Sequence, residues 1–173
     1  MNVSSSMTLQ RGVGLIEVMV ALLLLGIAVV GFAALQVRAV GSTHDAYFRT
    51  QGMAIAQEVA ERLRANSNAT FAINAVATYR AGSTGGVSDT QCITNTCTPT
   101  QMAQFDIANL NTLAASTLPN GRFAVVPCTN ATNSCVLVSW NLTSPTVGNT
   151  TTDCMSTGGS YILNADCMML EIY

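Results

Sequence analysis

The sequence has 173 residues, enough for one ordinary domain with an anchor and too few for two full cores. Only 9% of the residues are charged, against ~25% in a typical soluble domain. The net charge is −2, lysine is absent, and the arginines are scattered. This pattern excludes the clustered basic surface that nucleic-acid binding requires, so we expect no nucleic-acid partner.

Residues 1–12 are polar and end in Arg11-Gly12. They lack the apolar core and the small-residue cleavage site of an ordinary secretory signal. An apolar run follows them and would remain in the mature chain after removal of this segment. Met7 offers an alternative start that leaves the Arg11-Gly12 junction intact.

The apolar run extends from Val18 to Leu35, eighteen consecutive residues without a charge or a strongly polar group. As a helix it would be ~27 Å long, close to the ~30 Å hydrocarbon core of a bilayer. The run therefore predicts a membrane-spanning helix. Glu17 directly precedes this run. A carboxylate so close to the apolar core of a membrane costs free energy unless it is paired, so Glu17 is a candidate functional residue.

Beyond Leu35 the helical pattern continues and becomes amphipathic. One stripe on a 3.6-residue repeat comprises Val37, Val40, His44, Phe48, Ile55, Val59 and Leu63. Glu58 and Arg62 stand four residues apart, in the favourable order for a helical ion pair. We expect one helix from about residue 13 to 65, stopped at residues 66–68, with its stripe covering a sheet.

The remaining chain predicts a short helix and a small sheet. Residues 69–96 are expected to be irregular. Thr98-Pro99 predicts a helix start, and Pro119-Asn120-Gly121 predicts its end. The apolar face of this helix comprises Ala103, Ile107, Leu110, Ala114 and Leu118, widened by Phe105 and Leu113. Residues 122–126, 135–142 and 168–173 predict strands, and their short connections favour an antiparallel sheet.

Six cysteines lie in the last half of the sequence: Cys92, Cys97, Cys128, Cys135, Cys154 and Cys167. Their even number beyond the membrane span indicates an oxidising compartment and disulfides. Six cysteines allow fifteen pairings, among which the close spacings favour the sequential one. A zinc site is the alternative, but only the first pair fits zinc-ligand spacing, and His44 lies far away. We expect no metal and no cofactor.

The stretch Arg11-Gly12-Val13-Gly14-Leu15-Ile16-Glu17, with the apolar run after it, resembles the N-terminus of type IV pilins and type II secretion pseudopilins. The resemblance implies that prepilin peptidase cuts between Gly12 and Val13 and that the new N-terminus at Val13 is methylated. Glu17 then becomes the fifth mature residue. Val13 stands where these families usually have Phe, and Gly14 where they have Thr.

Three further segments are similar to minor pilins of the type IV pilus: residues 34–36, 57–66 and 97–101. The implied fold is α+β and type IV pilin-like, with a long N-terminal helix packed on a small antiparallel sheet, an extra short helix and disulfide-tied loops. The implied organisation is a leader (1–12), a transmembrane and assembly segment (13–35), an amphipathic segment (36–66) and a globular head (67–173).

The same resemblance implies partners and location. The partners are major and minor pilins, prepilin peptidase and the inner-membrane pilus assembly machinery. The chain would cross the bacterial inner membrane once, with its head in the periplasm, and would then enter the surface pilus.

Cleavage after Gly12 would place a cationic amine at Val13, about one helical turn from Glu17. The family implies that Glu17 pairs with the amine of an adjacent subunit, which registers incoming pilins. The alternative for Glu17 is an interfacial carboxylate that remains hydrated.

The expected function is that of a minor pilin, in a priming or tip complex. The alternatives are a type II secretion pseudopilin, an adhesion module displayed on a pilus, and a membrane-tethered thiol oxidoreductase. The last would need a reactive cysteine, commonly in C-x-x-C, and the nearest approach is C-x(4)-C. Ser139 has neither a nucleophile-elbow context nor an available base, so we expect no catalytic residues.

Overall fold

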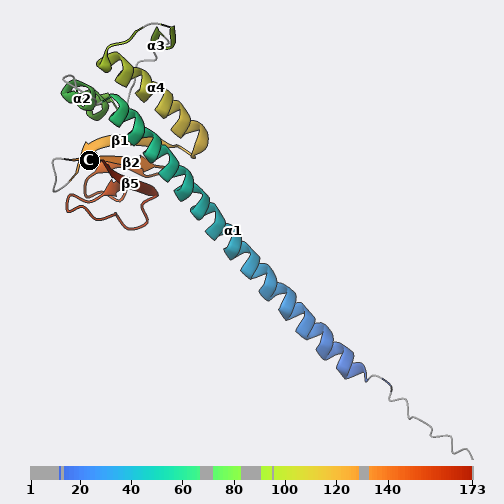
Figure 1. Ribbon diagram of the computed structural model, residues 1–173. Coiled ribbons are helices and arrows are strands. Elements are labelled where there is room, and N and C mark those ends of the chain that lie inside the picture. Colours follow the sequence, from blue (N-terminus) through green and yellow to red (C-terminus); the bar gives the residue numbers. More distant parts are fainter. Residues whose placement is uncertain are drawn as a thin grey trace, which may run out of the picture. The chain divides into compact units, whose positions relative to one another are not determined.

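The computed structural model describes residues 12, 14–66, 72–82, 91–94, 96–128 and 133–172 (Figure 1). The chain divides into two compact units, residues 1–44 and residues 45–173, and each is described by itself. One helix, α1 (Leu15–Asn66), runs through both. The predicted long helix is therefore confirmed, with bounds within two residues of those expected.

The first unit contains the apolar part of α1. Its large apolar side chains are exposed from Leu15 to Val40. A Cβ at Gly26, Gly31 or Gly41 would meet nothing within 4 Å. The glycines of this unit therefore create no close contact within the chain.

In the second unit, α1 supplies one side of the core. Ile55, Val59 and Leu63 are buried, and Phe48 packs against the same cluster. Val37 and Val40, in the first unit, are exposed, so the predicted stripe is buried within the chain only from Phe48 onward. At Gly52 an added Cβ would lie 3.1 Å from Cζ3 of Trp140, so this glycine lets the indole pack against α1.

The structure corrects the expectation that residues 69–96 are irregular. They contain α2 (Ala72–Gly82) and the single turn α3 (Gln91–Thr94). Helix α2 includes several alanines, which favour helix. Its Val76 and Tyr79, three residues apart and so on one face, both pack into the core, and Tyr79 is completely buried.

Helix α4 (Pro99–Thr117) begins and ends where the sequence predicted. The hydroxyl of Thr98 accepts from the backbone N–H of Gln101, and the Gln101 side chain accepts from the backbone N–H of Thr98. This capping box satisfies two backbone donors that the helix itself leaves unpaired. The predicted apolar face is confirmed, because Ala103, Ile107, Leu110, Ala114 and Leu118 are all buried.

The main sheet has three antiparallel strands in the order β1-β2-β5. They are β1 (Arg122–Pro127), β2 (Ser134–Ser139) and β5 (Cys167–Ile172). The antiparallel sheet is as predicted, but β2 ends at Ser139 rather than at residue 142. The chain turns there because Asn141 has a left-handed φ of 56° and Thr143 N–H donates to Trp140 O.

The two faces of β2 contribute to different clusters. Val136 and Val138 belong to the core that α1 and α4 cover, whereas Leu137 packs with Cys154 and Cys167. All residues of β2 are buried. Burial of each such aliphatic side chain stabilises the fold by ~1.5–3 kcal/mol before entropy costs. The head therefore folds around its central strand.

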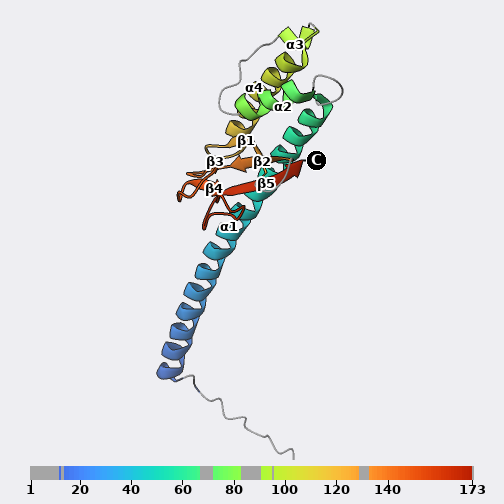
Figure 2. The same ribbon diagram turned by 90° about the vertical axis from the view of Figure 1, so that its left-hand side faces the viewer.

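A second, two-stranded sheet was not predicted. It pairs β3 (Ser144–Val147) in parallel with β4 (Asp153–Met155). Figure 2 shows β3 and β4 beside the main sheet. The turn between them is held by Asp153, whose carboxylate accepts from the hydroxyls of Thr146 and Thr150 and from the backbone N–H of Thr150. These hydrogen bonds hold the pKa of Asp153 below its usual value.

Candidate processing and assembly site

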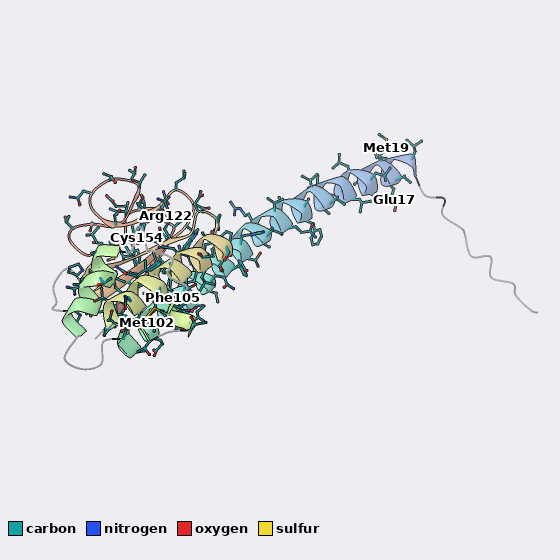
Figure 3. All side chains as sticks on the ribbon, turned by 90° about the horizontal axis from the view of Figure 1, so that it is seen from above. Glu17, Met19, Met102, Phe105, Arg122 and Cys154 are labelled. Atoms are coloured by element: carbon teal, nitrogen blue, oxygen red, sulfur yellow. A yellow bond between two sulfur atoms is a disulfide. The ribbon has the colours of Figure 1, made fainter. Side chains whose placement is uncertain are left out.

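Glu17 lies in the first turn of α1, where its backbone N–H donates to Gly14 O at 2.9 Å. Figure 3 draws Glu17 and Met19 projecting from the start of the helix. A carboxylate in the first turn interacts favourably with the helix dipole, by ~0.3–1 kcal/mol. Gly12 is exposed, and Val13, the predicted new N-terminus, lies outside the described residues.

The apolar segment after Glu17 is long and apolar enough to cross a membrane. Its most apolar window of 18 residues has a mean hydropathy of 2.9, and none of that window is buried within the chain. Glu17 is the only charged residue from 15 to 37. An exposed apolar surface of this size is typical of a segment that contacts lipid or other helices, and Glu17 is the acidic side chain at its start.

In the head, a carboxylate joins three helices. Asp106 of α4 is buried; it accepts from the hydroxyl of Tyr79 at 2.6 Å and from Nη1 of Arg62 at 3.0 Å. Nη2 of Arg62 also bonds Glu58 at 2.5 Å, so the predicted ion pair on α1 is present. The network links α1, α2 and α4 through one acceptor, and removing that acceptor would leave the buried hydroxyl of Tyr79 unpaired.

These contacts shift two pKa values. Burial raises the pKa of Tyr79, and the hydrogen bond to Asp106 and its negative charge raise it further. Burial alone would lower the pKa of Arg62, but the hydrogen bonds and charges of Glu58 and Asp106 outweigh it and raise that pKa. Tyr79 is therefore neutral and Arg62 charged throughout the physiological range.

All six cysteines form disulfides, and the bonds are the sequential pairs that the spacing favoured: Cys92–Cys97, Cys128–Cys135 and Cys154–Cys167. The first closes the loop before α4, the second joins the end of β1 to β2, and the third joins β4 to β5. No cysteine remains free, so none can act as a thiolate ligand. Within the described residues there is no group of His, Cys, Asp and Glu side chains that could hold a metal ion.

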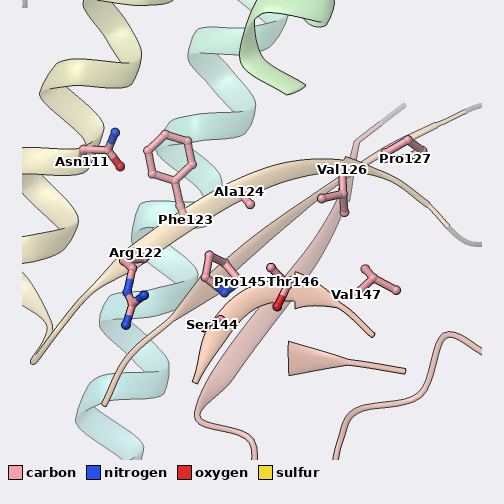
Figure 4. Close-up of a pocket in the computed structure, with 10 residues that line it drawn as sticks. All are labelled: Asn111, Arg122, Phe123, Ala124, Val126, Pro127, Ser144, Pro145, Thr146 and Val147. Atoms are coloured by element: carbon pink, nitrogen blue, oxygen red, sulfur yellow. The ribbon is translucent and has the colours of Figure 1, made fainter. Parts of the chain in front are cut away.

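A groove of about 720 Å³ lies in the head, which we call the strand groove. It is lined by most of β1, by all of β3 and by Asn111 of α4, as Figure 4 shows. Among the described residues that line it, Arg122 is the one cation. Sequence reasoning missed this groove because β3 was not predicted. It also missed Tyr79 and Asp106: the alanines of α2 could have indicated the helix that carries Tyr79, and the spacing of Asp106 from Ala103 and Leu110 could have placed it on the apolar face of α4.

A long apolar N-terminal helix, a small antiparallel sheet, extra short helices and disulfides together are consistent with the type IV pilin fold. The chain is a type IV pilin-like protein with a prepilin methylation motif. Residues 34–108 match the family described as type IV pilin Tt1218, and residues 7–33 match the prokaryotic N-terminal methylation motif. No curated protein and no solved structure matches the chain.

The two matches adjoin one another and cover the N-terminal motif, α1, α2, α3 and the first part of α4. The sheet and its disulfides lie beyond them. Similarity to pilins is thus concentrated in the helical part of the chain, and the strand groove belongs to the part outside the matches.

Proposed function

We propose that this protein is a minor type IV pilin that enters the pilus through α1 and supports pilus biogenesis in a priming or tip complex. Among minor pilins we assign it to PilV, the type IV pilus modification protein, which its sequence resembles at residues 34–36, 57–66 and 97–101. The role is structural and needs no catalytic residue. Its partners are major and minor pilins and the inner-membrane assembly machinery.

The observation that carries this proposal is the methylation motif followed by an exposed apolar helix with one acid at its start. Prepilin peptidase removes residues 1–12 and leaves a methylated Val13. Residues 13–35 then hold the chain in the inner membrane with its head in the periplasm, and later pack among pilin helices. Residues 36–66 join this segment to the head, residues 67–173.

Glu17 gives the assembly step its selectivity. In an apolar environment its ionised carboxylate requires a partner, and cleavage creates one in the amine of Val13. Pairing with the amine of an adjacent subunit offsets the cost of burial and fixes the axial register of the two helices. Before assembly the same carboxylate remains hydrated at the membrane surface.

Mass spectrometry of the mature chain tests the processing step. The N-terminal peptide should begin with methylated Val13, and Gly12→Leu should yield an uncleaved chain. A mature chain that begins elsewhere would contradict the assignment.

Incorporation of Glu17→Ala into sheared pili tests the assembly step. The variant should be cleaved normally but recovered in pili in much smaller amounts than the wild type. Glu61→Ala is the matched control, because it removes a carboxylate from the exposed face of the same helix and should incorporate normally. Normal incorporation of Glu17→Ala would remove the charge-pair argument.

A type II secretion pseudopilin would carry the same helix and motif. Crosslinking in the native host separates the two roles: the chain should be recovered with type IV pilins rather than with secretion pseudopilins. A deletion strain that still assembles normal surface pili would count against a role in biogenesis.

A further inference from the structure

We propose that the strand groove binds an extended peptide segment of another protein, with a carboxylate of that segment held by Arg122. The groove lies in the head, and this binding is separate from the assembly role proposed for α1. It would give the head a specific protein ligand in addition to its place in a filament.

The shape of the groove fits an extended chain. Its walls are two strands, β1 and β3, and a six-residue strand such as β1 is about 20 Å long. The groove is open to solvent, whereas sites for compact small molecules enclose most of the ligand surface. A peptide in an extended conformation can lie along such a groove and present alternate side chains to it.

The charge of the groove specifies a carboxylate. Arg122 is exposed and has no hydrogen-bond or ion-pair partner among the described residues. None of the described residues that line the groove is acidic. Arg80, on α2, is different, because it donates to Ser134 at 2.8 Å. The guanidinium of Arg122 is therefore free to make the bidentate pair that arginine forms with carboxylates.

The rest of the lining specifies apolar side chains beside that acid. Val126, Pro145 and Val147 line the groove, and Val147 is 37% exposed. The hydroxyl of Thr146 is already engaged by Asp153 at 2.5 Å, which ties β3 in place. A ligand with one carboxylate and neighbouring apolar side chains would complement both parts of this surface.

Binding of short fluorescent peptides to the full chain in non-ionic detergent tests the proposal. The probes are two pentapeptides of alternating Val and Thr with an amidated C-terminus. One carries a single Asp at its N-terminal end and the other a single Asp at its C-terminal end. Two matched probes carry Asn in place of that Asp. Fluorescence anisotropy should show at least one Asp probe binding about tenfold or more tightly than its Asn counterpart, as expected for a charge-assisted pair.

Two variants and one control assign that difference to the groove. Arg122→Gln should abolish the preference for Asp. Arg49→Gln, which removes an exposed arginine that does not line this groove, should preserve it. Val147→Phe should weaken all probes by filling the groove, while thermal unfolding of the head shows that the variant remains folded.

Equal binding of the Asp and Asn probes, or an Asp preference that survives in Arg122→Gln, would overturn the proposal. Competition by N-acetylaspartate at the same concentration as the peptide would overturn it as well, because the ligand would then be a small carboxylate. Failure here would not affect the pilin role, which is tested by the incorporation of Glu17→Ala.

Discussion

The hydroxyl of Tyr79 donates a 2.6 Å hydrogen bond to Oδ2 of Asp106 inside the head. The two residues belong to α2 and α4 and are 27 positions apart in the sequence. The other oxygen of the same carboxylate accepts from Arg62 of α1. This side chain of α4 therefore joins three helices, and its partner Tyr79 is completely buried.

Removing this acceptor should destabilise the head. Asp106→Ala leaves the buried Tyr79 hydroxyl and one end of Arg62 without a partner, and we expect it to lower the free energy of unfolding by about 2–3 kcal/mol. Tyr79→Phe removes only one donor, and Arg62 still pairs with Asp106, so it should cost about 1 kcal/mol. Urea unfolding followed by the fluorescence of Trp140, the single buried tryptophan, measures both. Equal costs for the two variants would show that Arg62 gains nothing from Asp106.

The raised pKa of Tyr79 predicts a loss of stability at alkaline pH. Its folded pKa lies above the unfolded value of about 10. The fold therefore favours the protonated phenol; this contribution is complete below pH ~10 and declines as the pH rises above it. Urea midpoints between pH 8 and pH 11 should fall more steeply for the wild type than for Tyr79→Phe. Tyr47→Phe, which removes an exposed tyrosine, should follow the wild type, and a parallel fall in all three would contradict the prediction.

The elements predicted from the sequence are those whose signals are local. The cap at Thr98 and the stripe of α4 lie within one helix, and the spacing of cysteines such as Cys154 and Cys167 limits their partners. Helix α2 was missed because its core-facing side chains are few, and β3 because a four-residue strand that contains Pro145 has a weak pattern. The strand groove depends on both β1 and β3, so no local pattern indicates it.

The partner of Glu17 could not be derived in the same way. The sequence supplies the acid and the cleavage motif, but pairing across subunits depends on a second chain. Similarly, periodicity places Asp106 on the apolar face of α4, three residues after Ala103 and four before Leu110, but it does not supply the partners that a carboxylate needs there. Its burial follows from Tyr79 and Arg62, which reach it from two other helices.

The three disulfides should differ in their contribution to stability. Cys154–Cys167 spans 13 positions and both residues are buried, whereas Cys92–Cys97 spans five and Cys92 and Cys97 are only half-buried. In the loop-entropy model the longer loop is worth about 3 kcal/mol and the shorter about 2 kcal/mol. Replacing Cys154 and Cys167 by Ala also leaves a cavity beside Leu137, which adds to the cost.

Urea unfolding of the two double-alanine variants measures this difference. The Cys154/Cys167 variant should lose at least about 1 kcal/mol more than the Cys92/Cys97 variant. Comparable losses would contradict both the loop-length difference and the added cost of the cavity beside Leu137.

Gly121 sits between α4 and β1, where the chain passes very close to the end of the helix. An added Cβ would overlap Ala114 O and lie 2.8 Å from Leu118 Cβ. The obstacle at Ala114 is backbone, which cannot rotate away, and Gly121 N–H also donates to Leu118 O at 3.0 Å. Gly121→Ala must therefore move either the last turn of α4 or the start of β1, and we expect the free energy of unfolding to fall by about 2–3 kcal/mol.

Gly158→Ala is the matched control, because its nearest new contact is Ser156 Oγ at 3.7 Å, and it should change the free energy of unfolding by less than about 0.5 kcal/mol. Similar unfolding midpoints for the two variants would show that the turn relaxes without disturbing the core.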